Sequence, residues 1–252
     1  MAISTDRAAA RPRAYVRVKG SDAEDFLQRM LSNDVTSAER VDALLLTPKA
    51  RLIAPVRIVR RGPDDFLLLT EPELGDTVRT TLLRSRFAAK CEIEPEEHTS
   101  TLVWRDEDGL AQAHEELDAE IAQNVDEQEL ERARIEAGVP VWGKELDDSI
   151  LPAEAGLDET HISFTKGCYP GQEPIARQHY RGRVNRRLRL LDVESASPGD
   201  EIRIGEKVVG RVTRAVPRVA LGYVRAEVPA DAELEIGGGR GRLRQALRDD
   251  DR

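Results

Sequence analysis

The sequence predicts an α+β protein with antiparallel sheets and a small β-barrel at its C-terminal end. Three strand-like segments between residues 41 and 70 are joined by short loops that contain Pro, Gly and Asp, the pattern of an antiparallel meander. Segments with apolar residues at helical spacing flank these strands. After Gly182 the chain changes to short alternating segments separated by turn residues, which is typical of a barrel.

The N-terminal part opens with one strand, one helix and the meander. Residues up to Arg13 are small and polar, so we expect a loosely held lead-in. A strand is predicted over 15–18, and Ser21-Asp22-Ala23-Glu24 has the pattern of a capping box at the start of a helix. The meander strands are expected over 41–47, 52–60 and 65–70.

A second helix and two strands follow the meander. The helix is predicted by apolar side chains at i, i+4 and i+8, namely Leu74, Val78 and Leu82. Strands are expected over 89–93 and 99–104, and Cys91 in the first of them is interpreted as a small buried hydrophobe. The acidic stretch 106–124 is expected to be exposed connection and helix.

The last helix before the site and the barrel strands also have clear signals. Asp126 and Glu129 form a second capping-box pattern, which predicts a helix over 126–137 that ends at Gly138. The barrel strands are expected over 184–194, 201–204, 207–216, 220–224 and 233–236. The glycines at 237–239 lack the following Lys-Ser/Thr of a phosphate loop and predict a turn, and the tail after Leu243 is expected to fray.

Composition limits the class of protein. The net charge of −9 over 252 residues argues against a general nucleic-acid coat, so direct nucleic-acid binding is not expected. Cys91 and Cys168 form no CxxC pair, which predicts neither a metal site nor a disulfide framework and indicates a reducing compartment. Without a signal-peptide core or an apolar run of about 18 residues, we expect a cytoplasmic protein with no membrane association.

The stretch 166–173, Lys-Gly-Cys-Tyr-Pro-Gly-Gln-Glu, is the strongest candidate for a site. Gly167 and Gly171 permit positive φ and close approach by another group, and Pro170 stiffens the loop between them. A short helix is predicted from Gly171 to a stop at Gly182.

Cys168 is the candidate reactive group of this loop. The helix N-terminus that follows and Lys166 two residues before it both favour a thiolate over a thiol. The alternative is a tight turn with an incidental cysteine, since a single cysteine in a glycine loop is a moderate signal.

The run from His161 to Arg189 resembles the signature of the YgfZ-type folate-binding proteins, relatives of the glycine-cleavage T-protein, an aminomethyltransferase. The family pattern Lys-Gly-Cys-aromatic-X-Gly-Gln-Glu is matched at 166–169 and 171–173, and Pro170 stands where a small hydroxyl residue is expected. The resemblance implies that Cys168 is the reactive thiol. It also implies folate-contacting roles for Lys166, Gln172, Glu173 and Arg177.

Two further segments are similar to the T-protein superfamily. The turn 32–36, Ser-Asn-Asp-Val-Thr, resembles its Thr-Asn-Asp-Val turn, which implies a folate contact for Asn33; alone, the turn would be a plain helix stop. The segment 134–146 resembles the one whose glutamate, here Glu136, hydrogen-bonds the pterin ring. A carboxylate can accept two hydrogen bonds from adjacent pterin donors, whereas the residue pattern alone predicts an ordinary solvated glutamate.

The resemblance implies a ring of α/β subdomains closed by the barrel, with tetrahydrofolate or a one-carbon derivative in a central cavity. It divides the chain into a folate-binding region of two α/β subdomains, residues 14–182, and a C-terminal barrel domain, residues 183–243. In the T-protein a catalytic aspartate lies on the strand that corresponds to 51–56. Ala54 and Pro55 occupy that place here, and neither can transfer a proton, so aminomethyl transfer is disfavoured.

Three functions follow from the resemblance. The first is a tetrahydrofolate-binding accessory protein, for which the resemblance implies no catalysis. Its thiol supports iron-sulfur cluster assembly or repair and cluster-dependent tRNA modification, with iron-sulfur proteins as partners. The second is an aminomethyltransferase of glycine cleavage. The third is a folate-binding module without chemistry, in which Cys168 is structural.

Overall fold

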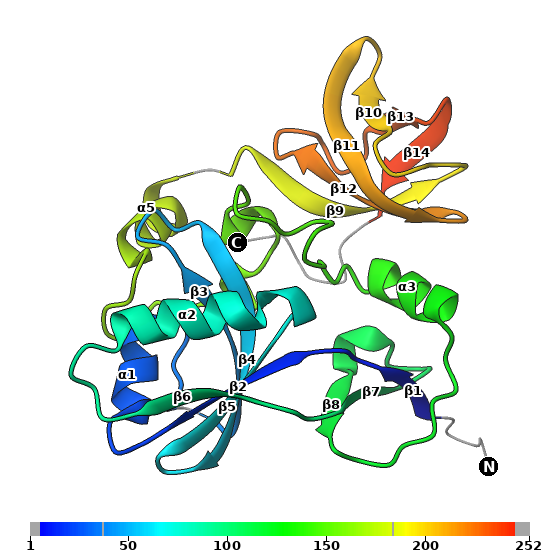
Figure 1. The fold of residues 1–252 in the computed structure, drawn as a ribbon. Coiled ribbons are helices and arrows are strands. Elements are labelled where there is room, and N and C mark those ends of the chain that lie inside the picture. Colours follow the sequence, from blue (N-terminus) through cyan, green and yellow to red (C-terminus); the bar gives the residue numbers. More distant parts are fainter. Residues whose placement is uncertain (1–5, 37, 183, 245–252) are drawn as a thin grey trace.

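The structure, a computed structural model, describes residues 6–36, 38–182 and 184–244, and it places three β-structures around the interior of the molecule (Figure 1). The first is a five-stranded antiparallel sheet of order β3-β4-β5-β2-β6. Its strands are β2 (Ala14–Lys19), β3 (Arg40–Leu46), β4 (Leu52–Gly62), β5 (Asp65–Thr70) and β6 (Glu92–Glu96). The predicted meander is therefore confirmed in place and direction.

Helices α1 (Ala23–Met30) and α2 (Gly75–Ser85) cover one face of this sheet. Phe26 and Leu27 of α1 and Val78 and Leu82 of α2 share one buried core with alternate side chains of the strands. Burial of such apolar side chains is the main stabilising term of the fold. Cys91 is buried beside this core, as predicted, although it directly precedes β6 instead of lying inside a strand.

The capping box predicted at Ser21 does not form. Asp22 is the N-cap of α1, but no side-chain capping bond is made there. The Asp22 carboxylate instead accepts a hydrogen bond from the Lys90 backbone N–H at 2.8 Å, because the chain returns beside this turn after α2. The local pattern is overridden by a partner 68 residues away.

The second β-structure is a three-stranded sheet of order β1-β7-β8, formed by β1 (Asp6–Ala10), β7 (Ser100–Arg105) and β8 (His114–Leu117). Two expectations were wrong here. The lead-in, expected to be loosely held, contains strand β1, which pairs along β7. The acidic stretch 106–124, where exposed connection and helix were expected, contains strand β8 and a 3-10 turn, η2 (Leu110–Gln112). Side chains of β1, β7 and α3 (Glu127–Glu136) form a small core of their own.

The capping box that starts α3 is present as predicted. The Glu129 N–H donates to Asp126 Oδ1 at 2.8 Å, and the Asp126 N–H donates to Glu129 Oε2 at 3.3 Å. These two bonds satisfy amide groups that a helix start otherwise leaves free.

The third β-structure is a closed barrel of order β10-β11-β12-β9-β14-β13. Its strands are β9 (Arg186–Val193), β10 (Glu201–Ile204), β11 (Lys207–Val216), β12 (Val219–Arg225), β13 (Glu233–Ile236) and β14 (Gly239–Leu243). Five of these strands were predicted, and β14 was not, because its Gly-Arg-Gly-Arg sequence has little strand propensity. Closure supplies β14 with two neighbours, and the tail 245–252 lies outside the described residues.

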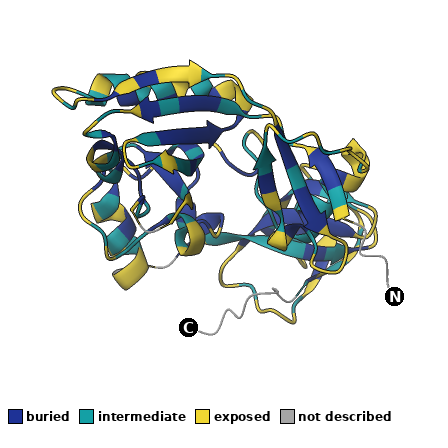
Figure 2. Cartoon of the chain, turned by 90° about the horizontal axis from the view of Figure 1, so that it is seen from below, coloured by how far each residue is buried: buried dark blue, intermediate teal, exposed yellow. Residues whose placement is uncertain are grey.

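The segment between α3 and the barrel joins the parts of the molecule. It holds three short helices, η3 (Pro152–Glu154), α4 (Asp158–His161) and α5 (Gln172–Arg181). Another short helix, η1 (Pro72–Leu74), lies earlier in the chain, directly before α2. The Tyr223 hydroxyl of β12 donates to the Glu145 carbonyl at 2.9 Å, and Arg214 of β11 donates to the Val139 carbonyl at 2.6 Å. Figure 2 shows buried residues running through both sheets and the barrel. No helix in the described part of the chain is long and apolar enough to cross a membrane.

Candidate functional site

The loop that carries Cys168 is tightly built at its C-terminal end. Gly171 is the N-cap of α5 and has φ +85°, and a Cβ added there would lie 2.7 Å from the Thr47 carbonyl oxygen and 3.0 Å from Ala50 Cα. The predicted need for glycine at 171 is therefore confirmed. The same prediction for Gly167 is wrong, because Gly167 has no positive φ and an added Cβ would meet nothing within 4 Å.

Tyr169 anchors the loop from inside. It is buried in a core with Leu44, Leu46 and Ile175, and burial raises the pKa of its hydroxyl to about 12. Cys168 directly precedes this anchor and is exposed, whereas Cys91 is buried. The Cys168 thiol is therefore at the surface, and the Cys91 thiol is inside the protein.

Lys166 holds the N-terminal end of the loop. Its Nζ donates to the Leu31 carbonyl at 2.8 Å and to the Asn33 carbonyl at 2.7 Å, and it lies 5.6 Å from the centroid of the Tyr169 ring. Burial lowers the pKa of Lys166 to about 8, while the Asp34 carboxylate acts in the opposite direction. The ammonium group therefore faces the end of α1.

Asn33 lies on the other side of this contact. Its Nδ2 donates to the Asp42 carbonyl at 2.8 Å and to the Thr160 carbonyl at 3.1 Å, and its Oδ1 accepts the Asp34 N–H at 2.9 Å. The structure thus brings Asn33 and Lys166 together, and the polar groups of both side chains form hydrogen bonds with backbone groups. Their contact with a folate stays a prediction.

The remaining motif residues lie on the first turns of α5. Gln172 is half-buried, and Glu173 and Arg177 are exposed. Within the described parts of the chain, the side chains of Glu173 and Arg177 form no hydrogen bond or ion pair, so both are available to a ligand or a partner. The N-cap of α5 lies three residues after Cys168, and the effect of a helix dipole fades within the first turn.

Glu136 is the last residue of α3. Its side chain is 43% exposed, and its Oε1 accepts one hydrogen bond, from Arg132 Nη1 at 3.2 Å. The preceding Ile135 is fully buried against Val219 and Leu221 of β12, which fixes this end of the helix on the barrel. Figure 1 draws α3 to the right and α5 to the left of the view, and within the described residues no hydrogen bond or ion pair joins Glu136 to the Cys168 loop.

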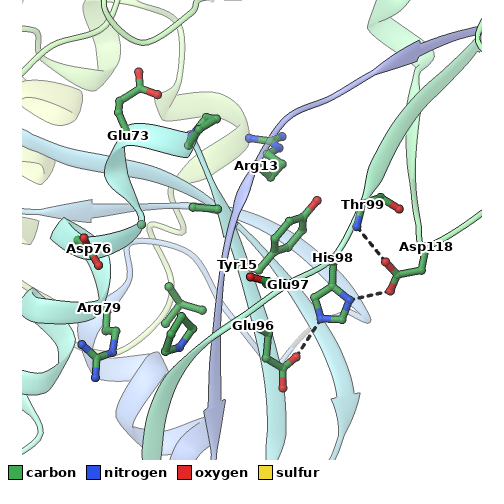
Figure 3. Close-up of a pocket in the computed structure, with 15 residues that line it drawn as sticks. Arg13, Tyr15, Glu73, Asp76, Arg79, Glu96, Glu97, His98, Thr99 and Asp118 are labelled. Carbon is green, nitrogen blue, oxygen red and sulfur yellow. Dashed lines mark hydrogen bonds and ion pairs between the residues drawn. The ribbon is translucent and has the colours of Figure 1, made fainter.

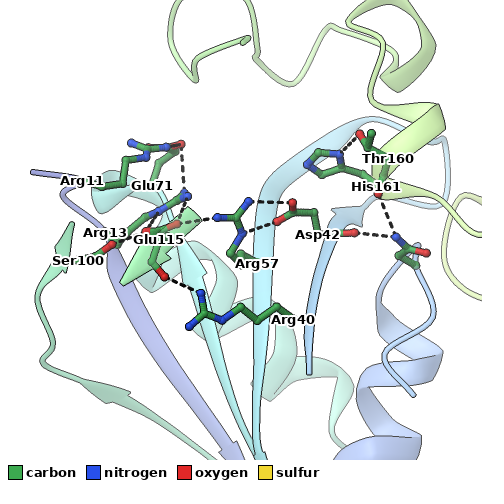
Figure 4. A network of polar contacts seen from close by, with 11 residues as sticks. Arg11, Arg13, Arg40, Asp42, Arg57, Glu71, Ser100, Glu115, Thr160 and His161 are labelled. Carbon is green, nitrogen blue, oxygen red and sulfur yellow. Dashed lines mark hydrogen bonds and ion pairs between the residues drawn. The ribbon is translucent and has the colours of Figure 1, made fainter. Parts of the chain in front are cut away.

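A chain of ion pairs crosses the interior between these regions (Figure 4). Arg13 binds Glu115 through two hydrogen bonds of 3.0 Å, and Arg57 Nη1 donates to the same carboxylate at 3.0 Å. Arg57 also donates to both Asp42 oxygens, at 2.7 and 2.9 Å. At the other end, Arg11 donates to Glu71 at 2.5 and 3.0 Å.

Burial and pairing oppose each other in this chain of charges. Burial raises the pKa of Glu115 and of Asp42, but hydrogen bonds and attraction from Arg13 and Arg57 outweigh it, and both pKa values are lowered. Glu115 and Asp42 therefore stay charged near neutral pH. These residues were not singled out from the sequence; the available signal was Arg57 alternating with the apolar Val56 and Ile58 along β4.

A separate open cavity of about 810 Å³ lies between the start of α2 and the link from β6 to β7 (Figure 3). On one wall, His98 places Nδ1 2.6 Å from Asp118 and Nε2 2.9 Å from Glu96. Tyr15 meets the His98 ring edge-on, with centroids 5.2 Å apart. Arg79 stands on the opposite wall, and its Nε is buried without a hydrogen-bond partner among the residues that the structure describes.

Two observations on the described residues bear on metal binding and on the T-protein's catalytic acid. In the ranges that the structure describes, no group of three or more His, Cys, Asp or Glu side chains is placed to hold a metal ion. Ala54 is fully buried in β4, and Pro55 pairs with Leu44 of β3. No carboxylate thus stands at the place that corresponds to the T-protein aspartate.

Comparison with known proteins extends the sequence resemblance. No family model matches the chain. It is 25% identical over 279 aligned residues to the tRNA-modifying protein YgfZ of Cronobacter sakazakii, covering 89% of this chain and 84% of that protein. It is also 31% identical over 223 residues to the mitochondrial iron-sulfur cluster assembly factor IBA57 homolog of Mycosarcoma maydis, covering 70% of this chain and 54% of that protein.

The fold has a close counterpart among solved structures. The glycine cleavage system aminomethyltransferase T of Bartonella henselae superposes with a TM-score of 0.82 over 97% of this chain and 86% of that one, at 16% identity. The arrangement of sheets and barrel is therefore that of the T-protein fold, as the resemblance implied. Within that superfamily, the chain belongs to the YgfZ-type family, whose Lys-Gly-Cys motif it carries at 166–168.

Proposed function

We propose that this chain is a tetrahydrofolate-binding accessory protein that supports iron-sulfur cluster assembly or repair, and through it cluster-dependent tRNA modification. The observation that carries the proposal is the exposed Cys168 thiol on a loop fixed by Lys166 and Gly171. A thiol displayed on an ordered loop is suited to transient chemistry with a partner protein. The names of the YgfZ and IBA57 relatives support the same assignment.

The residues present fit a reduced folate. A pterin ring offers adjacent N–H donors, and Glu136 has one carboxylate oxygen that accepts no hydrogen bond from the described protein groups. We propose that Glu136 holds the pterin ring, that Gln172, Glu173 and Arg177 belong to the folate site, and that Asn33 and Lys166 support it through their backbone contacts. A bound reduced folate would supply one-carbon carrier chemistry.

The chain's own residues divide into two groups in this proposal. Glu136 would bind and orient the ligand at the end of α3 that packs on the barrel, and the exposed Cys168 would meet an iron-sulfur partner at the surface. Direct reaction between the Cys168 sulfur and a pterin held by Glu136 is not part of the proposal. Aminomethyl transfer is not proposed either, since Ala54 and Pro55 carry no acid.

Two measurements test the proposal. Calorimetric titration of the purified chain with tetrahydrofolate and with its 5-formyl derivative is expected to show saturable binding. Cells lacking the native protein are expected to recover iron-sulfur enzyme activity with the wild-type chain and not with Cys168→Ala. Full rescue by Cys168→Ala would show that the thiol carries no chemistry, and turnover of an aminomethylated lipoyl carrier would show a transferase instead.

A further inference from the structure

Five hydrogen bonds join the turn that follows α1 to the segment that leads into the Cys168 loop. They are Ser32 Oγ to the His161 carbonyl (2.6 Å), the Ser163 N–H to the Ser32 carbonyl (3.0 Å), Asn33 Nδ2 to the Thr160 carbonyl (3.1 Å), and Lys166 Nζ to the carbonyls of Leu31 (2.8 Å) and Asn33 (2.7 Å). The two segments are about 130 residues apart in sequence. The Ser-Asn-Asp turn and the Lys-Gly-Cys loop are thus one structural unit.

Lys166 makes the last contact of this unit before the thiol. Helix α1 ends at Met30 with Leu31 as its C-cap, and carbonyl groups at a helix end lack partners within the helix. A lysine ammonium is well suited to such carbonyls, because it carries three donors and a charge that matches the negative end of the helix. The contact therefore satisfies the carbonyl of the α1 C-cap, Leu31, and the Asn33 carbonyl in the turn that follows, and it fixes Lys166 at once.

Cys168 lies between two fixed points. Lys166 is bound to the end of α1, and Tyr169 is buried in the neighbouring core. Only Gly167 and Cys168 lie between them, and Gly167 has free space around it. A bridge of two residues with both ends held leaves the sulfur little freedom of position.

We propose that Lys166 is a positioning residue for the Cys168 thiol: its ammonium, bound to the carbonyls of Leu31 and Asn33, fixes the bridge that displays the sulfur, and Asn33 supports it from the other side. This positioning role rests on the proposed function, because it takes Cys168 as the reactive thiol. It assigns the polar groups of Lys166 and Asn33 to the loop, where the family resemblance implied contact with folate.

Substitutions at 166 separate the hydrogen bonds from the charge. Methionine has similar length and no donor, so Lys166→Met leaves both carbonyls without their partner. Arginine keeps the positive charge, but its planar guanidinium is longer and cannot place a single nitrogen between two carbonyls. Lys49→Met is the matched control, because Lys49 is an exposed lysine on the β3–β4 turn beside Gly171.

The experiment measures, by NMR on the full chain, hydrogen exchange of the Ser163 N–H, which donates to the Ser32 carbonyl in this unit, together with rescue of iron-sulfur enzyme activity. We expect exchange to rise about tenfold or more in Lys166→Met and in Lys166→Arg, with Lys49→Met like the wild type. Both 166 variants are expected to lose rescue at a nearly unchanged melting temperature, while iodoacetamide still labels Cys168.

Wild-type exchange in Lys166→Arg, or full rescue by it, would overturn the proposal in favour of a simple requirement for positive charge. If Lys166→Met does not fold, Lys166→Arg and Ser32→Ala give the same reading of exchange at the Ser163 N–H. The exchange measurement needs neither folate nor cluster activity. Failure of the positioning role is therefore distinguishable from failure of the proposed function, which full rescue by Cys168→Ala would show.

Discussion

His98 and Asp118 join the five-stranded sheet to the three-stranded sheet. His98 lies on the link between β6 and β7, and its Nδ1 is 2.6 Å from an oxygen of Asp118, which directly follows β8. The other ring nitrogen faces Glu96 at 2.9 Å (Figure 3). Both nitrogens can donate only in the protonated ring, so the geometry favours the imidazolium form. Partial burial lowers the pKa of His98, but the hydrogen bonds to Glu96 and Asp118 outweigh it, and the pKa is raised.

This contact predicts a loss of stability as pH rises above neutrality. A histidine with a raised folded pKa contributes stability that is complete below its unfolded pKa of about 6.5 and is lost as pH rises through the folded pKa. The contribution is at most about 1 kcal/mol, because Arg17 and Arg61 also bind Glu96 and water screens the site. Urea unfolding between pH 6.5 and 8.5 is expected to show a smaller decline in His98→Gln.

The control for this measurement is His114→Gln. His114 is 57% exposed, and its one ion pair among the described residues is with Glu116 at 3.5 Å, so its removal is expected to leave the decline unchanged. The series starts at pH 6.5 because burial lowers the pKa of His161, whose titration acts below that pH. An equal decline in the wild type and in His98→Gln would contradict the role of the ion pairs.

Glu115 is the most buried charge of the interior ion-pair chain, with 1% of its side chain exposed. Replacing it with alanine leaves Arg13 and Arg57 without their shared carboxylate and is expected to lower the free energy of unfolding by about 3–5 kcal/mol. Glu116→Ala on the same strand, where the side chain is 39% exposed, is the control and should change it by less than about 0.5 kcal/mol. Equal effects of the two substitutions in urea unfolding would show that the chain of charges adds no stability.

Gly171 and Gly167 give opposite expectations within one loop. Gly171→Ala forces a Cβ into backbone atoms of the Thr47–Ala50 turn at a left-handed φ, so we expect a loss of about 1–3 kcal/mol in the free energy of unfolding. Gly167→Ala adds a methyl group to open space and should stay within about 0.5 kcal/mol of the wild type. Thermal unfolding of both variants checks the order, and a reversed order would be inconsistent with the close approach at Gly171.

Most strands were predictable from local signals. The meander, α3 and the first barrel strands combine apolar periodicity with turn residues or a capping box, and local and tertiary preferences agree there. The misses are β1, β8 and β14, which consist of small, acidic or Gly-Arg residues. Each becomes a strand because a neighbouring strand supplies partners for its backbone hydrogen bonds, and the local sequence does not show that this neighbour is present.

The site was predictable in its motif and not in its surroundings. The Cys168 loop and the limits of α5 follow from Gly171 and Gly182, which lie at the two ends of the helix. The joining of Lys166 to Asn33, and the ion pairs around Glu115, depend on residues more than 50 positions apart. A charged residue looks the same in sequence whether water or a distant partner satisfies it.

Glu136 is the folate contact with the clearest single-residue test. Glu136→Ala is expected to weaken binding of tetrahydrofolate by about 1.5–3 kcal/mol, the scale of a lost hydrogen bond to a charged group. Glu127→Ala is the control, since Glu127 is exposed at the other end of α3. Calorimetry on both variants checks the difference, after circular dichroism has confirmed that each is folded. Unchanged affinity in Glu136→Ala would remove this residue from the proposed site.

The two cysteines should differ sharply in reactivity. Cys168 is exposed, whereas Cys91 is buried, and its burial raises the pKa of the Cys91 thiol. Because the thiolate is the form that attacks iodoacetamide, and a buried sulfur is also hidden from the reagent, we expect Cys168 to be alkylated well before Cys91 at neutral pH. Mass spectrometry of a timed digest gives the order, and urea-unfolded protein, in which both sites are accessible, serves as the control. Equal or reversed labelling in the folded chain would favour a purely structural role for Cys168.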